Sequence, residues 1–146
     1  MKHLFLFLMA TLLWGEPSCS ELQRMERDAI VFGNGWNTIY VFVDPMCPNS
    51  KDFIDSIQSN PKVQKENTYF VFLYRINMFD SDDVINAIYR STDPKHALLE
   101  VMVFNHSLKE GKTNDEVLEK RKRIESIALK TAMKRRPYLI MYPFGS

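Results

Sequence analysis

The stretch that decides the fold reads Val41-Phe42-Val43-Asp44-Pro45-Met46-Cys47-Pro48-Asn49-Ser50-Lys51-Asp52-Phe53. It starts inside a β-branched and aromatic run, residues 38–43, which is typical of a buried strand. Asp44-Pro45 ends that strand, and Pro48 stands where a helix can begin. Apolar residues then recur at helical spacing until Asn60-Pro61 stops the pattern. The sequence therefore predicts Cys47 at a junction between a strand and a helix.

This position favours a reactive thiol at Cys47 over an inert one. A buried structural role is the usual alternative for a single cysteine. At a helix amino terminus, however, unpaired backbone N–H groups and the positive end of the helix dipole stabilise a thiolate. The strand-Cys-helix context therefore makes Cys47 the candidate nucleophile.

The rest of the chain alternates strand and helix patterns. A second buried strand is predicted over residues 68–74, and its order after a strand and a helix implies a parallel pair. Two helices are expected to open at Ser81 or Asp82 and at Asp93-Pro94. A longer helix begins near residues 113–115, and its basic run, Lys120 to Arg123, is expected to be solvated. The last predicted strand covers residues 138–142 and is entered through Pro137.

Composition limits the function classes. A chain of 146 residues with 45% hydrophobic and 25% charged residues predicts one globular domain and argues against disorder. The net charge of +1 gives no overall attraction to nucleic acid, which we do not expect as a partner. His96 and His106 have no cysteine or carboxylate cluster at ligand spacing, so we expect no metal and no cofactor.

The amino terminus has the pattern of a secretory signal peptide. Met1-Lys2-His3 is basic, and the apolar run over residues 4–14 is shorter than the ~20 residues of a membrane-spanning helix. We expect a signal peptide over residues 1–20 and a domain over residues 21–146, with cleavage after Gly15 or after Ser20. An uncleaved anchor is the alternative. Export implies a periplasmic or secreted protein, without stable membrane insertion after cleavage, in a compartment where disulfides persist.

The segment from residue 41 to residue 53 resembles the active-site segment of the DsbC and DsbG type periplasmic disulfide isomerases. Their pattern is a hydrophobic strand, Asp-Pro, one residue, and Cys-Pro-x-Cys. The resemblance spans about residues 38–142 and also rests on these segments: Leu73-Tyr74-Arg75, Asp80-Ser81-Asp82, residues 93–102, and Pro137 at the position of the family's cis-proline. It implies an α/β, thioredoxin-like fold, in which helices flank a central mixed sheet and a helical insertion is present.

Four departures from that family change what the resemblance implies. Ser50 stands where the family has its second cysteine, and a serine cannot form the intramolecular disulfide, which leaves isomerase-like or monothiol chemistry. Arg136 precedes Pro137, where the family has a small or β-branched residue. We expect the family's amino-terminal dimerisation domain to be absent. We also expect the last strand and helix of the fold to be missing from this chain.

The resemblance implies an exported thiol-disulfide exchange protein that acts on cysteine-containing exported proteins or small thiols. Cys47 and Ser50 are the expected catalytic residues, with Cys47 as nucleophile and the Ser50 hydroxyl near the thiolate. Pro48, Arg136 and Pro137 are expected to face the substrate. Alternatively, Arg136 points to solvent and extends the basic run before it. The competing function is a non-catalytic binding or assembly module of the cell envelope.

Overall fold

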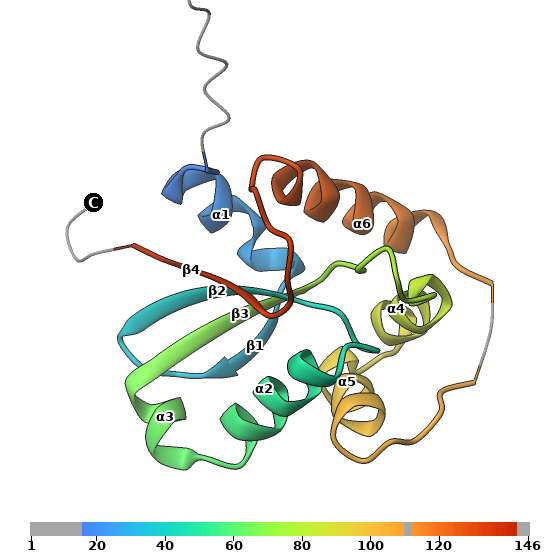
Figure 1. The fold of residues 1–146 in the computed structure, drawn as a ribbon, viewed down its shortest axis with the longest axis horizontal. Coiled ribbons are helices and arrows are strands. Elements are labelled where there is room, and N and C mark those ends of the chain that lie inside the picture. The colour runs from blue at the N-terminus through green and yellow to red at the C-terminus, as the bar shows by residue number, and fades with distance from the viewer. Residues whose placement is uncertain (1–15, 110–111, 143–146) are drawn as a thin grey trace, which may run out of the picture.

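The computed structural model describes residues 16–109 and 112–142, which form a four-stranded sheet covered by helices (Figure 1). The strand order is β1-β3-β2-β4. The strands are β1 (Ile30–Gly33), β2 (Asn37–Val43), β3 (Asn67–Leu73) and β4 (Tyr138–Met141). β2 and β3 are parallel, which confirms the predicted parallel pair, whereas β1 and β4 run antiparallel to their neighbours. The sheet is therefore mixed, as expected.

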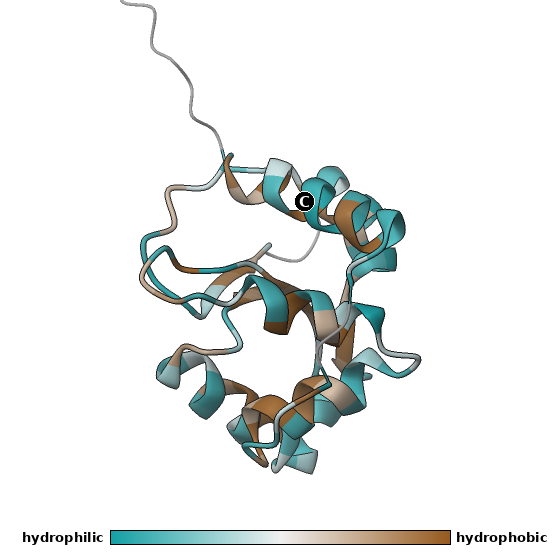
Figure 2. Cartoon of the chain, turned by 90° about the vertical axis from the view of Figure 1, so that its right-hand side faces the viewer, coloured by the Kyte–Doolittle hydropathy of each residue, from teal (hydrophilic) through white to brown (hydrophobic). Residues whose placement is uncertain are grey.

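Helices cover both faces of this sheet (Figures 1 and 2). Before the sheet come α1 (Cys19–Met25) and the 3-10 turn η1 (Glu26–Asp28). The other helices are α2 (Pro48–Gln58), α3 (Pro61–Glu66), α4 (Asp82–Arg90), α5 (Pro94–Met102) and α6 (Asp115–Ala128). In Figure 1, α1 and α6 lie on one side of the sheet and α2 and α3 lie on the other. Between β3 and α6, α4 and α5 form the expected helical insertion.

The core lies where the central strands meet the helices. Val41, Phe42 and Val43 of β2 are completely buried because helices cover the strand on both faces. The rings of Phe42 and Phe72 pack 5.3 Å apart between β2 and β3. At the end of β3, the backbone N–H of Leu73 donates to the Tyr89 hydroxyl at 2.8 Å, which fastens α4 to the sheet. The strand that leads to Cys47 is thus held rigidly.

Most of the predicted helix starts are confirmed by their caps. Asp93 accepts the backbone N–H of His96 at 3.0 Å, and Asn114 accepts that of Val117 at 2.9 Å. Asn60-Pro61 ends α2, but it also starts α3, which the sequence analysis missed. The Asn60 side chain accepts the Val63 N–H at 3.2 Å, and Pro61 occupies the first turn of α3. The same two residues therefore follow the end of one helix and begin the next.

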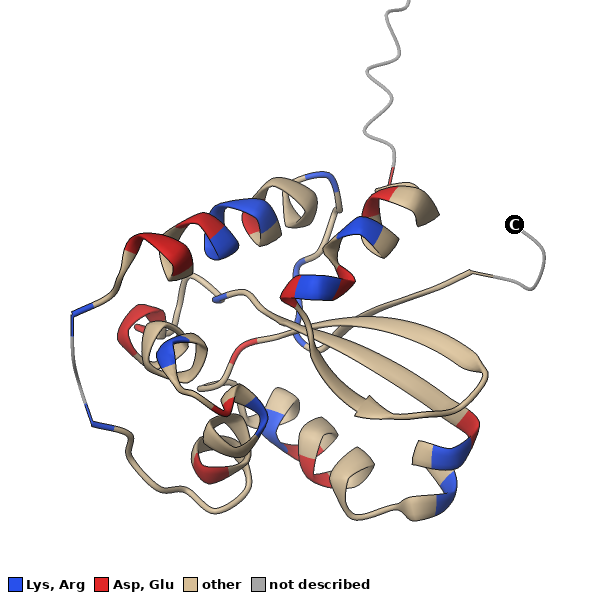
Figure 3. Cartoon of the chain, turned by 180° about the vertical axis from the view of Figure 1, so that it is seen from behind, with Lys and Arg blue, Asp and Glu red and all other residues tan. Residues whose placement is uncertain are grey.

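The expectation of a fully solvated basic face on α6 is wrong. Arg123 donates from Nε and Nη2 to Asp28 at 2.8 and 2.9 Å, and Asp28 is buried. Arg121 pairs with Asp82. Lys122 is exposed, as expected, and pairs with exposed Glu119 at the surface. Figure 3 shows the charged residues on helices and loops, with the strands free of them, so these ion pairs join α6 to elements around the sheet.

In the described part of the chain, no helix combines the length and the apolar character that crossing a bilayer requires. Of the signal peptide expected over residues 1–20, residues 1–15 lie outside the described residues. The expectation about a missing last strand and helix stays a prediction.

Candidate active site

Cys47 is the residue at the amino-terminal cap of α2, immediately after the loop that leaves β2. Its backbone N–H donates to the carbonyl of Asp44 at 3.0 Å, and its own carbonyl accepts the N–H of Lys51 at 3.0 Å. The loop therefore turns tightly into the helix. Cys47 is 5% exposed, so only a small part of the residue is accessible to another molecule.

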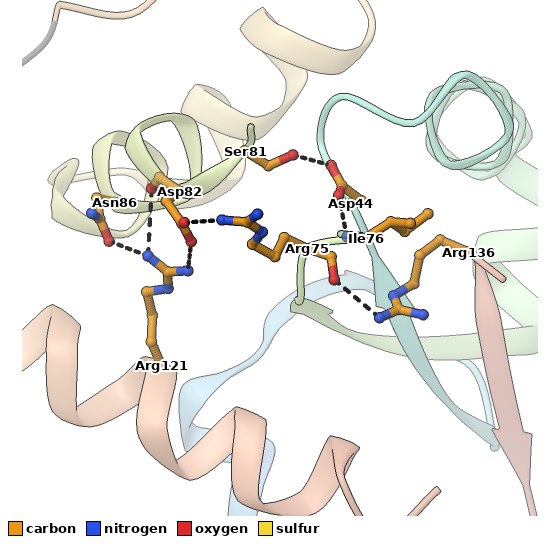
Figure 4. Close-up of polar contacts among 8 residues, drawn as sticks. All are labelled: Asp44, Arg75, Ile76, Ser81, Asp82, Asn86, Arg121 and Arg136. Atoms are coloured by element: carbon orange, nitrogen blue, oxygen red, sulfur yellow. Dashed lines mark hydrogen bonds and ion pairs between the residues drawn. The ribbon is translucent and has the colours of Figure 1, made fainter. Parts of the chain in front are cut away.

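The carboxylate of Asp44 holds this loop in place (Figure 4). Its Oδ1 accepts the backbone N–H of Met46 at 2.9 Å and the hydroxyl of Ser81 at 2.6 Å. Its Oδ2 accepts the backbone N–H of Ile76 at 2.6 Å. Asp44 is completely buried, and these charge-assisted hydrogen bonds compensate for the loss of water around it. One side chain thus ties the Cys47 loop to the segment after β3 and to α4.

Two expected roles change because of this network. Ser81 stands at the cap position of α4, but its hydroxyl makes no cap hydrogen bond and donates to Asp44 instead. Ser50 is buried, and its hydroxyl accepts the backbone N–H of Asp44 at 3.2 Å. The Ser50 hydroxyl therefore binds the backbone of the loop between β2 and α2, and so links the first turn of α2 to the end of β2. A part for Ser50 in the chemistry stays a prediction.

The segment before β4 returns the chain to the cysteine. The peptide bond between Arg136 and Pro137 is cis, and the carbonyl oxygen of Arg136 lies 3.8 Å from the Sγ of Cys47, which can donate its S–H to it. The two residues are 89 positions apart in sequence. The fold thus brings together Cys47, Arg136 and Pro137, as the resemblance implies, with Pro48 exposed at the start of α2.

The side chain of Arg136 is buried, with 6% of the residue exposed, so it does not point to solvent as an extension of the basic run. A substrate-facing role for Arg136 stays a prediction. Its Nε donates to the carbonyl of Tyr74 at 3.1 Å and its Nη2 donates to that of Arg75 at 3.2 Å, while the guanidinium stacks 4.8 Å from the Tyr74 ring centre. The guanidinium satisfies carbonyls that follow β3, and nothing in the sequence signals this.

Burial lowers the pKa of the Arg136 guanidinium, because a charged group loses hydration there. The negative charges of Asp44 and of a Cys47 thiolate act in the opposite direction and favour the protonated guanidinium. The buried guanidinium of Arg136 therefore interacts electrostatically with Cys47, and the backbone carbonyl of Arg136 faces the Cys47 sulfur.

A second polar cluster continues from the site toward α6 (Figure 4). Asp82 accepts hydrogen bonds from both Arg75 and Arg121, and Arg121 also donates to Asn86 at 2.8 Å. These contacts lower the pKa of Asp82, and the hydrogen bond from Arg121 has the largest effect. Arg75 thus belongs to the Asp82 cluster through its side chain and supports Arg136 through its carbonyl.

The comparisons with known proteins agree with this geometry. No family model and no curated protein matches the sequence. Among solved structures, the chain is similar to the disulfide interchange protein of Neisseria gonorrhoeae, with a TM-score of 0.60 and 20% identity over 79% of this chain and 80% of that one. It is also similar to Proteus mirabilis ScsC in a compact conformation, with a TM-score of 0.66 and 14% identity over 84% and 67% of the two chains. The fold is thioredoxin-like.

A third similar structure, Helicobacter pylori DsbG, has a TM-score of 0.59 and 18% identity, and the match covers 84% of this chain and 60% of that one. The expected fold class, a thioredoxin-like sheet with a helical insertion, is confirmed. Across the described ranges, no three histidine, cysteine, aspartate or glutamate side chains gather so that they could hold a metal ion. Within this thioredoxin-like fold, the Cys47 thiol is the candidate reactive group of the site.

Proposed function

We propose that this thioredoxin-like protein is exported and carries out thiol-disulfide exchange through Cys47. The observation that supports it most is the position of the Cys47 sulfur at the amino terminus of α2, facing the Arg136 carbonyl just before Pro137. The names of the similar structures, a disulfide interchange protein and DsbG among them, point to the same chemistry. The substrates we propose are cysteine-containing exported proteins or small thiols and their disulfides.

The reaction needs one thiol of this protein. The Cys47 thiolate attacks one sulfur of a substrate disulfide, a mixed disulfide forms, and the other substrate sulfur leaves as a thiolate with the electron pair. A second thiol, from the substrate or from a small molecule, then attacks the mixed disulfide and releases Cys47. Ser50 carries a hydroxyl and takes no part in electron transfer. The net result is a rearranged disulfide, which is isomerase-like, monothiol chemistry.

Two positively polarised groups of the fold lie near Cys47. The first backbone N–H groups of α2 point toward its amino terminus, and the helix dipole is positive there. The buried guanidinium of Arg136 adds a full positive charge that interacts with Cys47. Asp44 contributes the opposite sign, but its carboxylate is occupied by three donors.

Export through a cleaved signal peptide is part of the proposal. The Ser18 hydroxyl accepts the backbone N–H of Glu21 at the start of α1, and the Glu21 carboxylate accepts the backbone N–H of Ser18, which together make a capping box. Cleavage after Ser20 removes this cap from the mature protein, whereas cleavage after Gly15 retains it. We therefore propose cleavage after Gly15, which leaves Cys19 in the mature chain together with Cys47.

A second candidate function rests on the burial of the site. Cys47 is 5% exposed and the Ser50 hydroxyl is bound to the loop backbone, which fits a binding or assembly module whose cysteine no longer reacts. The two functions differ in one measurable property, which is whether a disulfide can reach Cys47 and exchange with it.

The test is adduct formation with oxidised glutathione, followed by intact-mass measurement. The variant Cys19→Ser isolates Cys47, and the variant Cys47→Ser isolates Cys19, which is partly exposed. We expect one glutathionyl group on the Cys19→Ser variant and a much faster reaction there than on the Cys47→Ser variant. If folded Cys19→Ser protein forms no adduct, thiol-disulfide exchange is ruled out and the binding module is supported.

A further inference from the structure

A cavity of about 310 Å³ opens beside the cysteine, and none of the roles above uses it. Its walls come from three parts of the fold: the motif, the helical insertion and the loop after α5. The residues that carry the argument are Met46, Lys51, Val84, Ala87, Val101 and Leu108.

The cavity starts one residue from the thiol. Met46 directly precedes Cys47, and its side chain lines the cavity. Lys51, whose backbone N–H donates to the Cys47 carbonyl at 3.0 Å, lines it from one helical turn further along α2. A substrate that brings a sulfur to Cys47 in an extended conformation moves about 3.3 Å per residue, so a neighbouring side chain reaches this opening.

Most of the wall is apolar. Val84 and Ala87 of α4 face it together with Val101 of α5 and Leu108 of the following loop. Met46 is 39% exposed, so part of its side chain is available to an apolar group that enters the cavity. Two charged side chains lie at the edge of the cavity, Lys51, whose Nζ donates to the Asn105 side chain at 3.5 Å, and the exposed Asp83.

The volume restricts the occupant further. About 310 Å³ lies at the lower end of the range for small-molecule pockets, about 300 to 1,000 Å³. It equals the liquid volume of about ten water molecules at about 30 Å³ each. That space accommodates one large side chain.

We propose that this cavity is a specificity pocket that receives a large apolar side chain, of the size of leucine, methionine or phenylalanine, next to the reacting cysteine of a peptide substrate. This inference rests on the proposed thiol-disulfide exchange and names its substrate class. The pocket binds the substrate's apolar side chain against Met46 and the insertion helices, and this holds the substrate sulfur in line with Cys47. The helical insertion thereby contributes substrate selection to a site whose chemistry lies in the motif.

The test is a single-turnover reaction with short peptides whose cysteine is present as a mixed disulfide with nitrothiobenzoate. The Cys47 thiolate attacks the peptide sulfur, a Cys47-peptide disulfide forms, and the coloured aryl thiolate leaves with the electron pair. The peptides differ only in the residue next to cysteine, which is phenylalanine, leucine, alanine or glutamate. All measurements use the Cys19→Ser background, so that the released colour reports on Cys47.

We expect the phenylalanine and leucine peptides to react about tenfold faster than the alanine peptide, the discrimination that burial of a larger apolar group gives. Two variants fill the pocket from different elements, Ala87→Trp from α4 and Leu108→Trp from the loop after α5. Each should reduce the preference to about twofold or less. The matched control is Ala132→Trp, the same substitution at an exposed position after α6, which should keep the full preference.

The failures of the pocket and of the proposed function are distinguishable. If Ala87→Trp and Leu108→Trp fold, react normally with oxidised glutathione and keep the wild-type preference, the pocket assignment is wrong and the exchange function stands. A preference for the glutamate peptide that disappears in Lys51→Ala would also overturn the apolar pocket. If neither the peptides nor oxidised glutathione react with Cys47, the proposed function itself fails. If one filling variant does not fold, the other decides the question.

Discussion

The sulfur of Cys47 lies 3.8 Å from the backbone carbonyl oxygen of Arg136, which joins the start of α2 to the segment before β4. The Arg136 side chain turns the other way and donates to the carbonyls of Tyr74 and Arg75. One residue therefore presents its backbone to the Cys47 sulfur and uses its side chain to hold the segment that follows β3.

Ser50→Cys should convert the monothiol site into a dithiol. The new thiol lies three residues after Cys47 on the first turn of α2, so it can attack a mixed disulfide at Cys47 without a second molecule. We expect a shorter lifetime of the glutathione adduct and a gain of insulin reductase activity. Asn49→Cys, at the exposed neighbouring position, is the control and should give neither effect. Unchanged adduct lifetimes in Ser50→Cys would mean that the motif is not arranged for exchange.

Asp44→Asn should loosen the loop that carries Cys47. An amide replaces one acceptor oxygen by a donor, and this nitrogen then faces an N–H or O–H donor in a completely buried position. We expect a loss of about 2 kcal/mol or more in the free energy of unfolding, measured with urea, and slower adduct formation at Cys47. Asp52→Asn, at an exposed position of α2, should stay within about 0.5 kcal/mol of wild type. Equal stabilities of the two variants would contradict the anchoring role of Asp44.

Arg136→Lys should destabilise the fold although the charge is kept. A lysine ammonium lacks the planar fork that reaches several carbonyls at once, and it gives up the stacking on Tyr74. We expect a loss of about 1 to 3 kcal/mol in thermal or urea unfolding. The neighbouring exposed Arg135→Lys supplies the control and should change the stability little. A stable Arg136→Lys protein would show that charge alone suffices at this position.

Acid should weaken the link between α4 and α6 through Asp82. The hydrogen bonds from Arg121 and Arg75 lower the pKa of Asp82 in the folded state, so the unfolded chain binds the proton more readily. The stabilisation is present above about pH 4, the usual range of an aspartate, and is lost as the pH falls through the folded pKa. Because the Asp82 side chain is 40% exposed, solvent screening keeps the contribution to about 1 kcal/mol or less.

The check for Asp82 is urea unfolding from about pH 6 to about pH 2.5. The difference in unfolding free energy between wild type and Asp82→Asn should shrink as the pH falls. Asp55→Asn, exposed on α2, should show a small difference that does not depend on pH in this way. A constant difference between wild type and Asp82→Asn across that range would contradict the ion pair.

Residue 16 should be the first residue of the exported protein. Besides the capping box at Ser18, the Tyr138 hydroxyl donates to Glu16 at 3.1 Å, and the Tyr142 hydroxyl donates to the carbonyl of Pro17. Cleavage after Gly15 preserves these contacts with β4 and the residue after it, whereas cleavage after Ser20 removes them. Intact mass of the protein recovered from the periplasm or the medium identifies the terminus. A mature chain that starts at Glu21 would contradict this prediction.

The sequence by itself determined the elements whose signals are local. The β-branched run of β2, Pro48 at the start of α2, and the caps Asp93 and Asn114 each act on backbone within a few residues, so their patterns predicted strands and helices correctly. The parallel pairing of β2 with β3 followed from their order along the chain. Cys47 was identified as the candidate nucleophile for the same reason, because the strand-to-helix junction on which that prediction rests lies within its own segment.

The tertiary structure alone decided which distant groups the buried polar side chains reach. Arg136 and Arg123 each belong to a basic run in the sequence, yet one binds carbonyls beyond β3 and the other binds Asp28. The strand β1 was missed because it is short and is stabilised by antiparallel pairing with β3, a partner that its own sequence does not specify. A buried charge or backbone polar group loses its hydration and therefore needs a hydrogen-bond partner. Which partner lies within reach depends on packing across the whole domain and not on the neighbouring residues in the sequence.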